Sequence, residues 1–174
     1  MDSDQDGEHI KTVYAHFGLA LFLAQVLEHG LVNALVLVEL LPTRAGNPVP
    51  HKQWEATYDS FCEQNFKATL GKMIRNLKEA VVIPANLERI LDEALRKRNF
   101  LAHDYFRERD VAFLSKEGRE KMIDELQDAQ ALFKAADTNV EEVTKTARDR
   151  YGITEEYINK MLKERLLKNN INLY

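Results

Sequence analysis

The residues best suited to chemistry lie together in one short segment. Arg98, Asn99 and His103 stand in the order Arg-Asn-x-x-x-His, and Tyr105 follows the histidine after one intervening residue. An imidazole titrates near neutral pH and can take or give a proton, and a guanidinium can hold two phosphate oxygens in its planar fork. The amide of Asn99 could orient the histidine or a phosphate oxygen. These side chains predict proton-transfer chemistry on a phosphate ester.

The segment is predicted to form the end of a helix that runs from about Pro84 to Arg109. At 3.6 residues per turn, its apolar stripe consists of Leu87, Leu91, Ala94, position 98, Leu101 and position 105. Arg98 therefore lies on the stripe that faces the core, where an unpaired guanidinium is costly to desolvate. Asn99 and His103 are four residues apart, so they lie on one side of the helix.

The end of this helix is locally basic in a chain whose formal net charge is -4. Five cations (Arg96, Lys97, Arg98, Arg107 and Arg109) stand against two acids (Asp104 and Glu108). Phosphate binding requires such a local excess. Apart from Arg98, these cations are the predicted RNA-binding residues.

RNA cleavage fits these side chains without a metal or another cofactor. RNA carries its own nucleophile, the 2′-hydroxyl, so an enzyme needs a base, an acid for the leaving oxygen and a cation for the phosphorane charge. His103 could serve as base or acid, and Arg98 could stabilise the charge. One chain offers a single histidine in this motif, whereas a symmetric homodimer offers two.

The segment from Arg98 to Tyr105 resembles the R-N-x-x-x-H and H-x-Y motifs of the HEPN domain family. The match covers eight residues, and a helical layout from about Glu8 to Phe133 agrees with it. The resemblance implies a metal-independent endoribonuclease, acting as a toxin or defence effector, in which two domains form a composite cleft. It also implies a nucleotidyltransferase antitoxin that adenylylates the tyrosine, here Tyr105.

Spacing of apolar residues predicts an all-α fold, which is an up-and-down bundle of four to five helices with a C-terminal helical extension. The resemblance implies that this bundle is HEPN-like. The expected organisation is a flexible acidic N-terminus (1–8), the bundle (9–134) and an extension packed on or beside it (135–174). The expected helices are Glu8 to Leu41 (ended by Pro42), Trp54 to Ala80, Pro84 to Arg109, Ser115 to Gly152 and Thr154 to about Lys168.

Composition predicts a soluble, single-domain cytoplasmic protein with no membrane association. Apolar residues make up 45% and charged residues 30% of the 174 residues, as in ordinary globular proteins. The single cysteine, Cys62, excludes an intramolecular disulfide and suits a reducing compartment. The apolar run from Phe17 to Leu41 is interrupted by Glu28 and other polar residues, so we expect a buried helix. No signal peptide is expected.

Several alternatives stay open at this stage. HEPN-like domains include catalytically silent RNA- or protein-binding modules, which would make this chain an antitoxin or adaptor. A purely structural bundle would leave the basic segment unexplained. Glu28 and Glu39 are candidate acids that could steady His103 or Arg98. Four aromatic residues could stack bases, although core packing is the preferred interpretation; they are Trp54, Tyr58, Phe61 and Phe66.

The acidic start of the chain imitates half of a calcium-binding loop. Its position equivalent to the bidentate glutamate is Val13, so calcium binding is rejected. The remaining histidines show no metal-ligand spacing, and no metal site is predicted.

Overall fold

The computed structural model describes residues 2–168, with side chains from 6 to 167, and throughout this part of the chain the only regular structure is helical. The predicted all-α bundle is therefore confirmed. Its elements are α1 (Asp2–Leu35), the π-helical segment η1 (Val36–Leu40), α2 (Leu41–Gly46), α3 (His51–Phe66), α4 (Leu70–Ala80), α5 (Ala85–His103), α6 (Tyr105–Glu108), α7 (Asp110–Phe113), α8 (Lys116–Arg150) and α9 (Glu155–Lys168).

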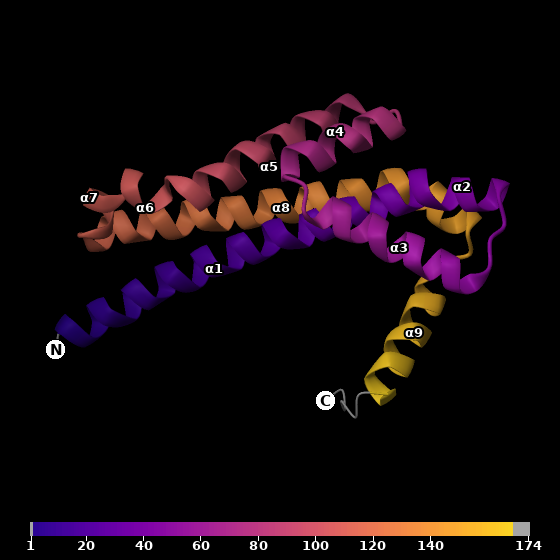
Figure 1. The fold of residues 1–174 in the computed structure, drawn as a ribbon. Coiled ribbons are helices and arrows are strands. Elements are labelled where there is room, and N and C mark those ends of the chain that lie inside the picture. The colour runs from indigo at the N-terminus through magenta and orange to yellow at the C-terminus, as the bar shows by residue number, and fades with distance from the viewer. Residues whose placement is uncertain (1, 169–174) are drawn as a thin grey trace.

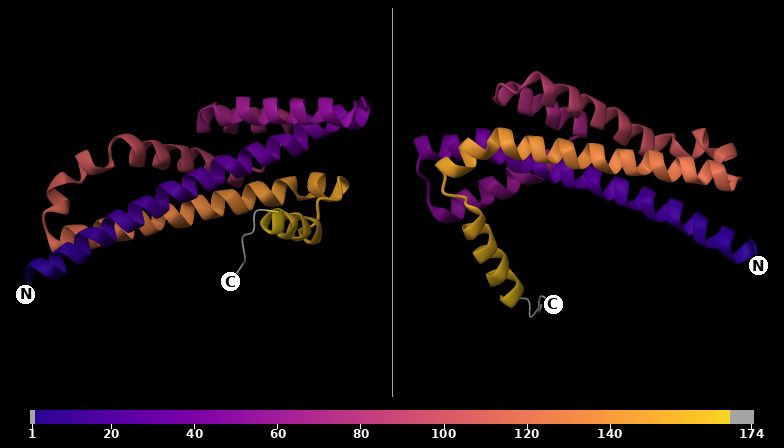
Figure 2. Two further views of the ribbon diagram at one scale, coloured as in Figure 1. Left: turned by 60° about the horizontal axis from the view of Figure 1, so that its bottom comes forward. Right: turned by 180° about the vertical axis from the view of Figure 1, so that it is seen from behind.

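The two longest helices, α1 and α8, lie side by side and form the body of the molecule (Figures 1 and 2). They run in the same direction, since Arg119 contacts Asp6 and Gln130 contacts His16. Helix α5 runs the opposite way across both, with α4 beside it. The main helices alternate in direction along the chain, which is the up-and-down order.

The core is formed by buried stripes of α1, α4, α5 and α8, and the stripe of α1 runs along most of its length. Val13, Ala20, Leu27 and Leu31 are fully buried, and each buried large aliphatic side chain contributes about 1.5–3 kcal/mol. Within the described residues, the stretch Asp6–Gly46 is also long and apolar enough to cross a membrane. Its 18-residue apolar segment has a mean hydropathy of 1.8, and 44% of that segment is buried here. Core helices pass the same test of length and composition.

Pro42 does not end the first helical rod, contrary to the prediction. The turn before it is π-helical, and the backbone N–H of Leu41 donates to the carbonyl oxygen of Val36, five residues earlier. This wider turn accommodates a residue that lacks an N–H and whose ring would crowd an α-helical carbonyl. The chain then continues through α2 to Gly46.

The predicted helix from Trp54 to Ala80 is two helices. Thr69 is extended, and its hydroxyl oxygen accepts a hydrogen bond from the backbone N–H of Lys72 at 3.3 Å, which caps the start of α4. The break allows α3 and α4 to contact α1 separately.

The predicted helix from Pro84 to Arg109 also breaks, at Asp104 and again at Arg109. His103 is consequently the last residue of α5, and Tyr105 is the first residue of α6. The breaks bend the chain around the start of α8, where Phe106 packs against Phe17, with ring centroids 4.8 Å apart.

The predicted boundary at 134/135 falls inside α8. Ala136, Val140 and Thr144 continue its buried stripe, so residues 135–150 belong to the bundle. Helix α9 alone extends away from the bundle (Figure 1). Its Tyr157, Met161 and Leu162 are about half exposed, although the extension was expected to pack on or beside the bundle. Residues 169–174 of the predicted extension lie outside the described part.

The acidic N-terminus is helical from Asp2 onward rather than irregular. The side chains of Asp2 and Asp4 lie outside the described residues, whereas Asp6 forms an ion pair with Arg119 of α8.

Candidate functional site

The last two turns of α5 carry Arg98, Asn99 and His103. The Arg98 side chain is one-third exposed and forms an ion pair with Glu28 of α1, with 3.3 Å between Nη2 and Oε1. Its other guanidinium nitrogen donates to the Asn99 side-chain oxygen at 3.5 Å. Arg98 therefore lies at the bundle edge, where Glu28 holds its guanidinium and part of the side chain is exposed to solvent.

His103 and Asn99 are exposed. Among the described residues, the His103 imidazole has no hydrogen-bond or ion-pair partner, and the Asn99 amide does not reach it. The imidazole is thus free to exchange a proton with a bound molecule. Asn99 orients Arg98 in this structure, not the histidine.

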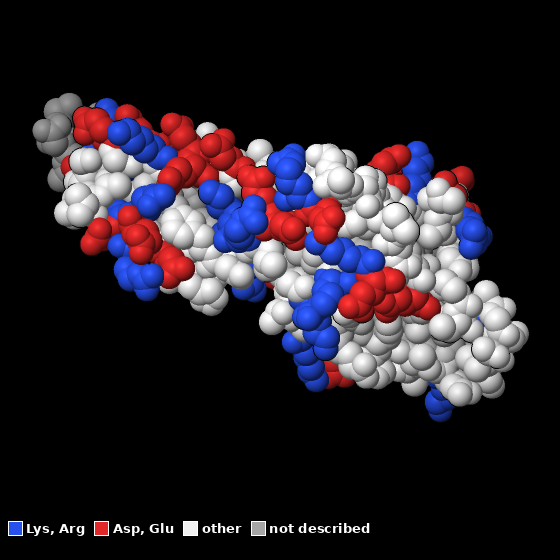
Figure 3. Space-filling model, turned by 90° about the horizontal axis from the view of Figure 1, so that it is seen from above, with Lys and Arg blue, Asp and Glu red and all other residues white. Residues whose placement is uncertain are grey.

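Two of the predicted RNA-binding cations are engaged in ion pairs. Arg109 forms a two-pronged pair with Glu125 of α8, at 2.8 and 2.7 Å, and lies over the Phe100 ring. Arg107 binds Asp104 at 2.6 Å. Lysine and arginine side chains on the α4–α5 side of the molecule are interspersed with acidic ones (Figure 3).

The accessible positive charge near His103 is smaller than the sequence indicated. Among the described residues, the cations of this segment without an ion pair are Arg96, which is exposed, and Lys97, whose ammonium lies 6.0 Å from the centre of the Phe100 ring. Arg98 is paired with Glu28, and Arg107 is exposed but paired with Asp104.

The Arg109–Glu125 pair gives a pH-dependent contribution to stability. The hydrogen bond from Arg109 lowers the pKa of the Glu125 carboxyl. A lowered folded-state pKa means that the stabilisation is present above the unfolded-state pKa and is lost as the pH falls through the folded-state value.

We therefore expect Glu125→Gln to reduce the free energy of unfolding at pH 7 by about 0.5–1 kcal/mol, a small figure because the pair is partly solvated. The difference from wild type should shrink toward pH 3 in urea unfolding curves. Glu120→Gln, which removes a more exposed carboxylate 4.0 Å from Lys116 on the same helix, is the control and should leave stability nearly unchanged. An effect of Glu125→Gln that grows in acid would contradict this assignment.

Tyr105 is buried, and its hydroxyl donates a hydrogen bond to the backbone oxygen of Met122 at 3.1 Å. Its ring lies against Phe17 and Phe100. Burial, with the nearby charge of Glu125, raises the pKa of this phenol. Attachment of adenylate would first require Tyr105 to leave the core, so the geometry gives no support to the predicted modification site.

The second candidate acid, Glu39, does not join the motif. It lies in η1, eleven residues beyond Glu28, which is about 16 Å farther along the rod. Burial and the charge of Glu79 raise the pKa of its carboxyl. Glu28 is the acid that the fold brings to Arg98.

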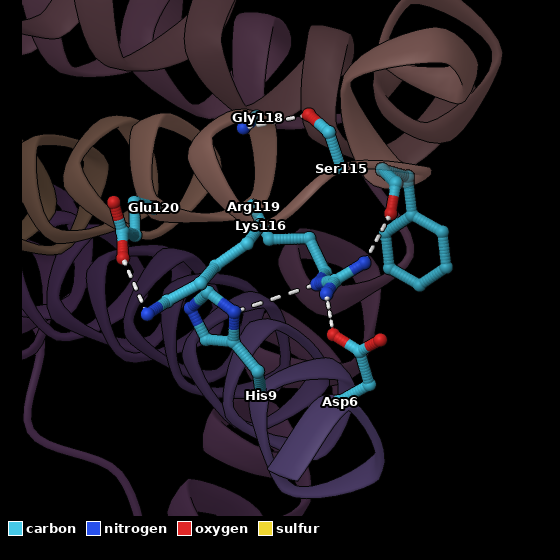
Figure 4. Close-up of polar contacts among 8 residues, drawn as sticks. Asp6, His9, Ser115, Lys116, Gly118, Arg119 and Glu120 are labelled. Carbon is cyan, nitrogen blue, oxygen red and sulfur yellow. Dashed lines mark hydrogen bonds and ion pairs between the residues drawn. The ribbon is translucent and has the colours of Figure 1, made fainter. Parts of the chain in front are cut away.

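A buried arginine near the start of α8 was not identified from the sequence. Arg119 is 4% exposed, and its guanidinium contacts the Asp6 carboxylate, the Nδ1 atom of His9 and the backbone oxygen of Phe113 (Figure 4). It joins α1, α7 and α8. The sequence did carry a signal, because Arg119 lies on the apolar stripe of its helix as Arg98 does.

The four aromatic residues considered for base stacking are divided between core and surface. Phe61 is partly buried against the core, whereas Tyr58 is 39% and Phe66 45% exposed. Trp54 is half-buried, and the Arg44 guanidinium lies 4.5 Å from the centre of its ring. The general expectation of core packing therefore holds for Phe61 only.

Comparison of the chain with family models, with curated proteins and with solved structures gives no match. Any function is therefore inferred from the residues of this chain. Within the described residues, no group of three or more histidine, cysteine or acidic side chains is arranged to hold a metal ion.

Proposed function

We propose that this chain is a HEPN-type, metal-independent endoribonuclease that acts as a homodimer, as a cytoplasmic toxin or defence effector. The observation that carries the proposal is the arrangement of His103 and Arg98. An exposed imidazole, without a partner in the described part of the chain, lies at the end of α5, little more than one turn from a guanidinium that is fixed at the bundle edge by Glu28.

The proposed reaction is an internal transesterification. The imidazole of His103 in one copy removes the proton of the 2′-hydroxyl, whose oxygen attacks the adjacent phosphorus. The bond from phosphorus to the 5′-oxygen breaks, and the protonated His103 of the second copy gives its proton to that oxygen. The products are a 2′,3′-cyclic phosphate and a free 5′-hydroxyl. Arg98 stabilises the charge that develops on the phosphorane oxygens.

Glu28 is proposed as a positioning residue for Arg98. Its carboxylate side chain is 21% exposed and lies on the helix that forms the core. A guanidinium held by a rigid helix loses less conformational freedom when it binds phosphate than a free surface arginine does. The same ion pair offsets the desolvation cost of Arg98.

The surface of α1 supports pairing with a second copy. Between Thr12 and Leu27 the helix contains no aspartate, glutamate, lysine or arginine. Leu19 and Phe22, three residues apart, are 43% and 59% exposed. An exposed apolar stripe on the helix that supplies Glu28 suits a contact between subunits.

We expect Phe22→Asp to dissociate the dimer, because it would place two carboxylates in an apolar interface. Sedimentation velocity should show a shift from dimer to monomer. Leu114→Asp is the matched control, since Leu114 is 81% exposed at the far end of α7, and it should leave the dimer intact. If both variants sediment like wild type, the α1 surface is not the interface.

Cleavage of a labelled RNA pool in EDTA tests the proposed activity. Wild type should cut, whereas Arg98→Ala should be at least about a hundredfold slower, since it lacks the cation for the developing charge. Arg75→Ala removes an exposed arginine of α4 and should keep the wild-type rate. Circular dichroism must show equal helicity in all three proteins. Equal cutting by wild type and Arg98→Ala would overturn the role of Arg98.

The second candidate function is a catalytically silent RNA- or protein-binding module. The observation that favours it is the engagement of Arg107 and Arg109 with acids of the chain itself, together with an Asn99 that does not orient His103. Absence of cutting in EDTA, with retained RNA binding, would select this function. A nucleotidyltransferase partner stays a prediction of the family resemblance.

A further inference from the structure

A cavity of about 730 Å³ lies where η1, α3, the end of α8 and the start of α9 meet. Small-molecule sites commonly have volumes of about 300–1,000 Å³. Val36 and Leu37 of the π-helical segment form part of its wall, and π-helical turns occur often at functional sites. Gly152, with φ of 66°, ends α8 and turns the chain so that α9 forms another wall.

Two opposite charges face this cavity from α8. Glu141 and Arg148 both line it and are seven residues apart, which places them on one side of the helix about 10.5 Å apart along its axis. Thr144 lies between them, and its hydroxyl is already donated to carbonyl oxygens of its own helix. Arg148 is half-buried as a residue, and its guanidinium has no ion-pair or hydrogen-bond partner in the described part of the chain. A half-buried cation without a counter-ion favours an anionic ligand group.

Aromatic rings complete the wall. Trp54 and Tyr58 of α3 have ring centroids 6.3 Å apart, and Tyr151 and Tyr157 line the cavity beside α9. The Arg44 guanidinium over Trp54 holds that indole in place. Aromatic side chains that line a cavity suit a planar ring, on which they can stack.

We propose that this cavity binds a small planar aromatic anion of the nucleoside monophosphate class. The phosphate binds Arg148, the base lies among the aromatic side chains, and an amino group of the base donates to Glu141. The spacing of these two positions along the helix axis is comparable with the distance from the phosphate to the far edge of the base. This site is distinct from the motif on α5 and does not depend on RNA cleavage.

Fluorescence of Trp54, the single tryptophan of the chain, tests the proposal directly. Excited at 295 nm, wild type should show saturable quenching by at least one of AMP, GMP and CMP, with matching heat in calorimetry, and weaker quenching by UMP, whose base has no amino group. Arg148→Gln should weaken binding of that nucleotide about tenfold or more, because it removes the charge-assisted contact with phosphate. It should leave the weak binding of the corresponding nucleoside unchanged.

Lys145→Gln is the matched control, because Lys145 is an exposed cation of the same helix that does not line the cavity. It should bind the nucleotide like wild type. The proposal is overturned if none of the four nucleotides binds, if Arg148→Gln binds as tightly as wild type, or if inorganic phosphate binds as tightly as the nucleotide.

Discussion

Replacing His103 by alanine is expected to slow RNA cleavage by about 10²- to 10⁴-fold, the usual contribution of a general acid or base. The imidazole is exposed, and within the described chain no side chain competes for its nitrogens, so its removal should cost little stability. Loss of activity would then report chemistry rather than unfolding. Single-turnover rates on a labelled RNA measure the effect, with thermal melts to show that the fold is intact.

His51→Ala is the matched control for this prediction. His51 is also an exposed histidine on a helix, with Nδ1 3.5 Å from the Glu55 carboxylate, but it lies at the start of α3. Its removal should leave the rate within about twofold of wild type, far less than the loss of a general acid or base. Equal rates for wild type and His103→Ala would exclude His103 from the reaction.

Gly118→Ala is expected to destabilise the fold by about 3 kcal/mol, the upper end of the cost of overpacking. A Cβ atom at this position would overlap the carbonyl oxygen of Ala112 and lie 2.6 Å from the carbon of that carbonyl. The overlapping atoms belong to the Ala112 backbone, which cannot move aside by a rotamer change as a flexible side chain could. The Gly118 N–H also donates to the Ser115 side chain at 3.0 Å, which caps α8 (Figure 4). Urea unfolding should show a reduced midpoint with an unchanged slope.

Gly7→Ala gives the comparison for the glycine effect. Gly7 is also helical, in α1, and a Cβ there would meet no atom within 4 Å. Alanine has the higher helix propensity, so this variant should be as stable as wild type or more stable. If Gly118→Ala unfolded at the same urea concentration as Gly7→Ala, the close approach of α7 to α8 would be wrong.

The long helices of the bundle could be predicted because their apolar stripes are continuous. The breaks could not, because each depends on contacts distant in sequence. In the sequence, Thr69 fits the helical pattern like any other residue. Only the structure shows that its hydroxyl caps the start of α4. Asp104 interrupts α5 where Tyr105 and Phe106 turn into the core, and this becomes visible only when Phe17 of α1 is placed beside them.

The length of α8 was predicted, whereas the extent of its buried stripe was not, for a different reason. The buried positions beyond Phe133 are Ala136, Val140 and Thr144, which are too small or too polar to mark an apolar stripe. Small side chains allow α1 and α8 to approach closely, so these positions are buried without being strongly hydrophobic. A pattern based on large aliphatic residues therefore ends too early.

Part of the candidate site was predictable from residue types alone. An arginine on an apolar stripe must be paired, and the fold pairs Arg98 with Glu28. The same rule would have identified Arg119. The partners of Arg107 and Arg109 depend on where the chain bends, so counting charges overstated the free positive charge beside His103.

The measurement that tests the central claim most directly is cleavage in EDTA of two matched RNA pools, one natural and one carrying 2′-O-methyl groups throughout. The account predicts that wild type cuts only the natural pool and leaves 2′,3′-cyclic phosphate ends, because the 2′-hydroxyl is the nucleophile. Cleavage of the methylated pool, or cleavage that appears only when a divalent metal is added, would contradict it.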